Sequence, residues 1–108
     1  MRLFASVVIT AACWLPAAMQ AQTRPEKPGQ LGLCAACHGE TGMSSQPGTP
    51  HLAGQDATYL IAALQAYRSG ARDVAVMRAA TGSLSAADVE RLAQWYAWQS
   101  IRPAPTEP

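Results

Sequence analysis

A chain of 108 residues is long enough for one small domain, and its formal charge of +1 is close to neutral. The eight basic side chains are spread along the sequence without a concentrated basic cluster, so composition gives no indication of nucleic-acid binding. A domain of this size buries a marginal core and usually needs a cross-link or a cofactor for stability.

Residues 1–21 have the pattern of a secretory signal peptide, in which Arg2 precedes an uncharged apolar run and small residues lead to cleavage near Ala21. The run is shorter than the roughly 20 residues of a membrane span, so we expect no span in the mature form. Retention as an uncleaved anchor and lipid attachment at Cys13 are the alternatives. The mature chain would begin at Gln22 and carry no net protein charge, because Arg2 leaves with the signal.

The remaining chain divides into a flexible polar lead-in at 22–28, a domain at 29–102 and a tail at 103–108. No stretch alternates between polar and apolar residues, which predicts an all-α fold without strands. A first short helix is expected to start near Pro28, because proline suits the first helical turn, and to run into segment 34–38.

Residues 39–55 are rich in glycine, proline and small polar side chains, which predicts a long irregular loop. Loops of this length in a compact domain usually surround something functional. The next helix has clear boundaries, since Asp56 can cap its start and Gly70 can end it.

A further helix is opened by a capping box at Ser85 and Asp88 and ends before Pro103. Its apolar residues recur at helical spacing and form one stripe. Residues 71–84, which lie between the two clear helices, are expected to form a short helix or a loop that crosses the core.

Cys34 and Cys37 are separated by two residues and His38 follows directly, which fits the attachment signature for one covalent haem c. The two thiols can add to the vinyl groups on one porphyrin edge, and the histidine is then carried beneath the ring to reach the iron. Three alternative interpretations use the same residues. A thioredoxin-like dithiol needs a βαβ context, a zinc site with His51 lacks a second close-spaced pair, and a disulfide would close a very tight loop.

The iron then needs a sixth ligand or an open position. Met43 follows His38 by five residues and has little chain with which to reach the opposite haem face. His51 would make a bis-histidine haem. Met77 follows His38 by 39 residues, with a complete helix between them, so spacing favours it and leaves the others open.

Five segments, taken in order, resemble bacterial class I cytochromes c of the cytochrome c4/c553 group: CAACHG at 34–39, PHLAGQ at 50–55, YRSGAR at 67–72, LSAADV at 84–89 and AQWYA at 93–97. The resemblance covers nearly the whole mature chain. Cytochromes of the c4 type carry two such domains, whereas this sequence has one attachment motif, which makes it similar to a monohaem relative.

The resemblance implies a small class I cytochrome c fold, with about four short helices wrapped around one haem. It implies that Met77 is the sixth iron ligand, opposite His38, and that the Pro50 carbonyl accepts the proton of the far ring nitrogen of His38. Arg72 would pair with a haem propionate, or else be a solvated surface arginine. The expected haem-pocket and helix-packing residues are Tyr59, Leu60, Leu64, Trp95 and Tyr96.

A haem iron with both axial positions filled has no room for substrate, so we expect a periplasmic single-electron transfer protein and not an enzyme. Its partners would be redox proteins that donate and accept electrons through small, transient contacts. The first alternative is a dedicated haem c subunit of an exported dehydrogenase complex, which would make the protein part of a heteromer instead of a monomer. The second is a ligand-binding haem with an open sixth site.

Overall fold

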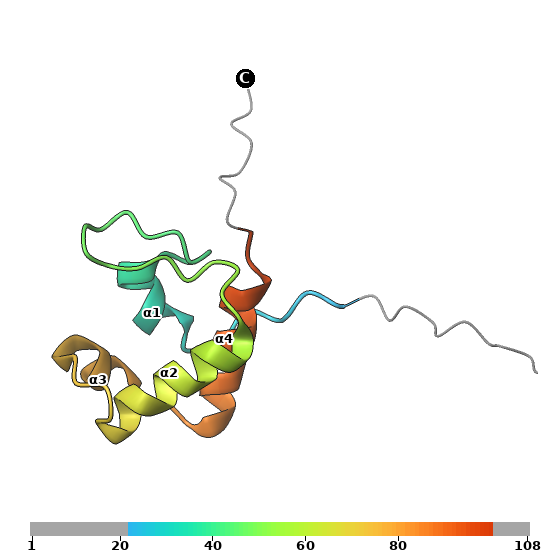
Figure 1. Ribbon diagram of the computed structural model, residues 1–108. Helices are drawn as coiled ribbons and strands as arrows, with labels where there is room; N and C mark the ends of the chain where they lie inside the picture. Colours follow the sequence, from blue (N-terminus) through green and yellow to red (C-terminus); the bar gives the residue numbers. More distant parts are fainter. Residues whose placement is uncertain (1–21, 101–108) are drawn as a thin grey trace, which may run out of the picture.

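The computed structural model describes residues 22–100, in which four helices and no strand are present (Figure 1). The helices are α1 (Leu31–His38), α2 (Ala57–Ser69), α3 (Ala75–Thr81) and α4 (Ala86–Trp98). The predicted all-α fold of four short helices is therefore confirmed for this part of the chain. The predicted signal peptide at 1–21 and the tail at 103–108 lie outside the described residues.

Helix α1 begins at Leu31, three residues later than the start expected near Pro28. Gly29 and Gln30 form a turn instead, in which the Leu31 amide donates to the Pro28 carbonyl at 3.2 Å. Glycine costs backbone freedom inside a helix, and Gly29 lies outside α1, although Gly32 is accommodated in its first turn.

The boundaries predicted for α2 are confirmed. The Asp56 carboxylate accepts a hydrogen bond from the Tyr59 amide at 2.8 Å and so satisfies one of the free donors at the helix start. Gly70 ends the helix with φ of 82°, a left-handed conformation that glycine adopts without a Cβ penalty.

The predicted capping box of α4 is also confirmed. The Asp88 amide donates to the Ser85 hydroxyl at 3.1 Å, and the Ser85 amide donates to the Asp88 carboxylate at 3.0 Å. Between α2 and α4, the segment predicted as a short helix or a loop contains the two-turn helix α3.

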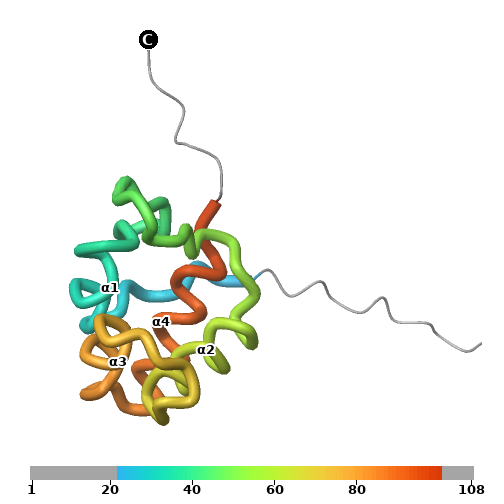
Figure 2. The backbone as a smooth tube through the Cα atoms, turned by 60° about the vertical axis from the view of Figure 1, so that its left-hand side comes forward, coloured from blue at the N-terminus to red at the C-terminus, as the bar shows by residue number. Residues whose placement is uncertain are grey.

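Helix α4 supplies most of the core, and it packs against α2, which also contacts α3. In Figure 2, α4 lies between α1 and α2. The buried cluster joins one residue each from α1, α2 and the α3–α4 turn to the inner face of α4: Leu31, Leu60, Leu84, Val89, Leu92, Ala93, Trp95 and Tyr96. The apolar stripe of α4 is therefore the centre of the packed interior.

The lead-in at 22–28 forms no helix or strand, yet it contacts the domain. Pro28 is buried, the Arg24 guanidinium lies 5.7 Å from the centre of the Trp95 ring, and Lys27 pairs with Glu40 at 3.0 Å. None of the helices in residues 22–100 is long and apolar enough to cross a membrane.

Candidate functional site

A cavity of about 640 Å³ lies between α1, the 39–55 loop, α2 and α3, and α4 supplies part of its wall. This volume is in the range of small-molecule and cofactor sites, roughly 300–1,000 Å³. Most residues that the sequence placed in a binding or ligating role line it: Cys34, Cys37, His38, Pro50, Tyr59, Leu60, Leu64, Arg72 and Met77. Tyr96 also lines it, whereas Trp95 lies in the packed core and not in the cavity wall. Residues from four separate parts of the chain therefore meet in one space.

His38 is the last residue of α1, and 7% of its surface is exposed. Its Nδ1 lies 2.8 Å from the Pro50 carbonyl oxygen. Because a carbonyl can only accept, Nδ1 carries the proton, and this assigns the tautomer from the hydrogen-bond partner. Nε2 is then left with its lone pair, which is the state an imidazole needs to bind a metal.

Cys34 and Cys37 are three residues apart on α1, so their side chains lie on one face of the helix, toward the cavity. Both thiols are free and partly buried, and burial raises the pKa of the Cys34 thiol. Within residues 22–100, no three His, Cys, Asp or Glu side chains are grouped so that they could hold a metal ion between them. The four-ligand zinc set that includes His51 is therefore not assembled here.

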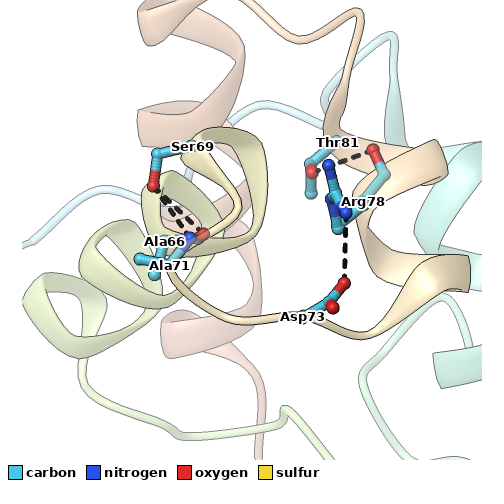
Figure 3. A network of polar contacts seen from close by, with 6 residues as sticks. All are labelled: Ala66, Ser69, Ala71, Asp73, Arg78 and Thr81. Carbon is cyan, nitrogen blue, oxygen red and sulfur yellow. Dashed lines mark hydrogen bonds and ion pairs between the residues drawn. The ribbon is translucent and has the colours of Figure 1, made fainter.

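Met77 lines the cavity from α3, and its backbone is well fixed. Its carbonyl accepts a hydrogen bond from the Thr81 hydroxyl at 2.8 Å. Figure 3 shows the nearby polar contacts, in which the Arg78 guanidinium pairs with the Asp73 carboxylate at 3.1 Å. At the end of α2, the Ser69 hydroxyl donates to the Ala66 carbonyl and accepts from the Ala71 amide. The Thr81 and Arg78 contacts fix α3 and the segment before it, and the Ser69 contacts close the end of α2.

The other two candidates for a sixth ligand are placed differently. Met43 is not among the cavity-lining residues. His51 does line the cavity, but its Nδ1 accepts a hydrogen bond from the Ser44 amide at 2.8 Å. One of its two ring nitrogens is therefore already in use by the loop.

Arg72 is exposed and lies beside the cavity. Its guanidinium stacks over the Tyr67 ring at 4.7 Å from the centroid, which is close enough for a cation–π contact. The stacking limits where the charged group can go and leaves its outer N–H donors available.

Two hydrogen bonds that the sequence did not reveal anchor the chain just after His38 to α4. The Trp95 indole donates to the Glu40 carbonyl at 2.7 Å, and the Tyr96 hydroxyl donates to the Gly39 carbonyl at 3.0 Å. Burial raises the pKa of Tyr96, with a smaller contribution from nearby negative charge, so its hydroxyl keeps the proton that it donates. The partners are more than 50 residues apart in sequence, and no local pattern signals such a pair.

The donor set of the cavity fits a haem better than a hydrated ion. Two thiols lie at one side, an imidazole presents a free Nε2, and a thioether sulfur lies on another helix. Much of the remaining lining is apolar, with Leu60, Leu84 and Leu92 among it. Such walls suit a large flat porphyrin, while thiols and imidazole suit its vinyl groups and iron.

Residues 31–99 match the family model for cytochrome c. The chain is 40% identical over 73 residues to cytochrome c-554(548) of Halomonas halodenitrificans, which covers 65% of this chain and 88% of that protein. It is 38% identical over 107 residues to a thiosulfate dehydrogenase electron acceptor of Thiomonas intermedia, and 34% identical over 79 residues to cytochrome c4 of Pseudomonas aeruginosa. These alignments cover 96% and 73% of this chain, but 48% and 39% of the two relatives.

Among solved structures, a cytochrome c4 of Acidithiobacillus ferrooxidans superposes with a TM-score of 0.56 at 30% identity, covering 59% of this chain and 37% of that one. The chain therefore spans less than half the length of the thiosulfate dehydrogenase electron acceptor and the c4 proteins that it matches, and most of the shorter cytochrome. The family model covers well over half of this sequence. The chain belongs to the cytochrome c family, carries covalent haem c and transfers electrons to and from redox partners, and it is not an enzyme.

Proposed function

We propose that this protein is a periplasmic single-electron carrier whose one haem c is attached through Cys34 and Cys37 and ligated by His38 and Met77. The observation that carries the proposal is that His38 and Met77 line one cavity from different helices, with Nε2 of His38 left free by the bond to Pro50. Export rests on the signal-peptide pattern of residues 1–21.

His/Met ligation gives a haem iron a higher reduction potential than two nitrogen donors do. The apolar wall formed by Leu60, Leu84 and Leu92 acts in the same direction, because burial disfavours the more highly charged oxidised iron. Arg72, with its outer N–H groups free of the Tyr67 ring, is suited to pair with a propionate. With both axial positions filled, the protein's task is limited to accepting and releasing electrons.

Electrons would pass where the haem edge comes closest to the surface. Four exposed apolar side chains surround the mouth of the cavity: Leu33, Tyr59, Val74 and Val76. A small apolar rim of this kind suits the brief contacts of electron-transfer partners, which lie at the low end of interface sizes.

The ligation is tested by replacing Met77 with alanine in the holoprotein. We expect loss of the methionine–iron charge-transfer band, a high-spin ferrous spectrum, and carbon monoxide binding at close to one equivalent, because the sixth position is opened. Met43→Leu is the matched control, since Met43 does not line the cavity, and it should keep the wild-type spectrum. A Met77→Ala protein that retains the charge-transfer band would exclude Met77 as the ligand.

Export is tested by fractionating cells that express the full chain. We expect the haem-containing protein in the periplasmic fraction, with Gln22 at its N-terminus by mass spectrometry. A protein that starts at Met1, or one that carries lipid on Cys13, would contradict cleavage after Ala21 and would indicate a membrane anchor instead.

A second candidate function is that of a dedicated haem c subunit of an exported dehydrogenase. It is favoured by the 38% identity over 107 residues to a protein named as a thiosulfate dehydrogenase electron acceptor. Gel filtration of the native protein at physiological salt distinguishes the two functions. A free carrier elutes at the mass of the monomer, whereas a stable heteromer with a dehydrogenase would establish the subunit role.

A further inference from the structure

A closed ring of hydrogen bonds begins and ends at His38. Nδ1 of His38 donates to the Pro50 carbonyl at 2.8 Å. The next residue, His51, accepts the Ser44 amide on its own Nδ1 at 2.8 Å. The Ser44 hydroxyl then donates to the carbonyl of Cys37 at 2.9 Å, and Cys37 directly precedes His38. The ring therefore ties the loop that carries the Pro50 acceptor to the helix end that carries the His38 donor.

We propose that His51 is a positioning residue for His38: by accepting the Ser44 amide, its neutral imidazole holds the Pro50 carbonyl on Nδ1 of His38. The inference rests on the proposed ligation of iron by His38. In this proposal His51 supports His38 through the loop and is not itself an iron ligand.

The need for such a support follows from the local backbone. Proline has no N–H, so Pro50 cannot be fixed by a donor of its own. After it, the amides of Leu52 and Ala53 bind the Gly42 carbonyl at 2.7 and 3.2 Å. Between these bonds and Pro50, the His51 side chain is the attachment nearest to the carbonyl that His38 uses.

The bond between Ser44 and His51 requires one protonation state. A backbone amide can only donate, so Nδ1 of His51 must be without a proton. A protonated imidazole carries N–H on both nitrogens and cannot accept, which opens the ring. His51 is exposed, so solvent can deliver that proton.

Opening the ring should raise the reduction potential. A hydrogen bond from Nδ1 to a carbonyl makes a ligating imidazole more basic, which stabilises oxidised iron, and loosening the bond removes that effect. The positive charge on a protonated His51 beside the cavity would raise the potential as well. The two causes are separable, because positioning also depends on the Ser44 hydroxyl, which carries no charge.

Other groups near the cavity could also titrate and must be distinguished. Tyr59 and Tyr67 line it from α2, Arg72 from the segment after α2, and Tyr96 from α4. A bound haem would add its two propionates. From α1, both cysteines are consumed by haem attachment. Two carboxylates flank the loop and are engaged elsewhere, Glu40 with Lys27 and Asp56 with the Tyr59 amide.

The experiment measures the reduction potential of the holoprotein between pH 5 and pH 8 in the wild type, His51→Asn, His51→Leu and Ser44→Ala. We expect the wild-type potential to rise toward acid pH. In His51→Asn the amide oxygen takes the place of Nδ1 without titrating, so the potential should stay near the alkaline wild-type value throughout. His51→Leu should be raised throughout, and Ser44→Ala should be raised already at neutral pH.

A second readout follows the bond itself by amide hydrogen exchange in the reduced holoprotein. Ser44 should exchange about fivefold faster in His51→Leu, as expected for the loss of one hydrogen bond of ordinary strength, and should stay protected in His51→Asn. Ser69→Ala is the matched control, because it removes side-chain bonds at the far end of α2 and should leave the potential and Ser44 exchange unchanged.

Two results would overturn the proposal. If the pH dependence persists in His51→Asn, it belongs to the propionates or to another cavity group. If Ser44→Ala has the wild-type potential, His51 acts by its charge alone. Failure of the underlying ligation is distinguishable, because it would appear as a wild-type spectrum at neutral pH that lacks a histidine-ligated, low-spin haem.

Discussion

His38 is held from both sides by atoms that come from distant parts of the chain. Its ring is oriented by the Pro50 carbonyl, and the carbonyls of the two residues that follow it accept hydrogen bonds from Trp95 and Tyr96. A side chain fixed in this way loses little freedom when it binds a metal, so the orientation is in place before ligation. The geometry at this one residue depends on both the 39–55 loop and helix α4.

Gly42 is the residue that allows the loop to approach α4 so closely. Its φ is 80°, and a Cβ built there would lie 2.5 Å from the Ala53 nitrogen and 2.8 Å from Cδ1 of Tyr96. We expect Gly42→Ala to lower the free energy of unfolding of the holoprotein by about 3 kcal/mol, from left-handed strain plus overpacking. Urea denaturation measures this loss.

Gly70→Ala is the matched control for that substitution. Gly70 has φ of 82°, but its nearest neighbour is the flexible Arg78 side chain at 3.8 Å. It should show the left-handed strain alone, about 1–2 kcal/mol. Equal losses of unfolding free energy in the two variants would mean that the close approach of Gly42 to Ala53 and Tyr96 adds nothing to the cost of a Cβ.

At the scale of elements, the helix ends were predictable because their signals are local. Asp56 and Ser85 each satisfy an amide three residues ahead, and such spacing is visible in the sequence. The start of α1 was less clear, because proline at 28 suggested a first turn that the following glycine does not continue. A side-chain cap therefore fixes the start of a helix firmly, whereas the start of the uncapped helix α1 was predicted three residues too early.

The cavity was predictable only in part. The pair of cysteines and His38 form one compact motif. Spacing favoured Met77 as the sixth ligand but left His51 open, and it was the resemblance to a family that implied Met77. The bond from Ser44 to His51 lies within a loop that has no periodicity, and the bond from Trp95 to Glu40 spans 55 residues. Contacts within an irregular loop, or between residues far apart in the sequence, leave no regular spacing from which they could be predicted.

Helix α4 should make the protein's stability sensitive to acid through its capping box. Hydrogen bonds from the Ser85 amide and hydroxyl lower the pKa of Asp88 below its ordinary value of 3.8, with a smaller contribution from Arg91. A carboxyl whose pKa is lower in the folded state stabilises the fold above its unfolded pKa. That stability is lost as the pH falls through the folded value.

We therefore expect the free energy of unfolding to fall as the pH drops below about 4, and part of this fall should be absent in Asp88→Asn. Asparagine still accepts the Ser85 amide but does not titrate. Urea denaturation at pH 3 and at pH 6 measures the difference between the two proteins. An equal acid loss in both would assign the effect to other carboxyls.

At the scale of the whole molecule, the interior is shared between a small packed cluster and the haem cavity. The buried cluster centres on the inner face of α4, while α1, α2 and α3 also face the cavity of about 640 Å³. Helix α1 presents Leu31 to the cluster and both cysteines to the cavity. The haem thus completes the core that so short a chain cannot build from side chains alone.

This shared interior predicts that the chain does not keep its fold without haem. Without haem, the apolar wall of this open space, which includes Leu60, Leu84 and Leu92, would lose its packing partner and face water, and so small a domain has little other apolar burial to keep it folded. We expect Cys34→Ser/Cys37→Ser, purified free of haem, to show weak helical circular dichroism and no cooperative thermal transition. Cys34→Ser alone, which keeps one thioether and the haem, should still unfold cooperatively at a lower temperature. A haem-free double variant with native helix content and a sharp transition would show that α4 and its neighbours suffice as a core.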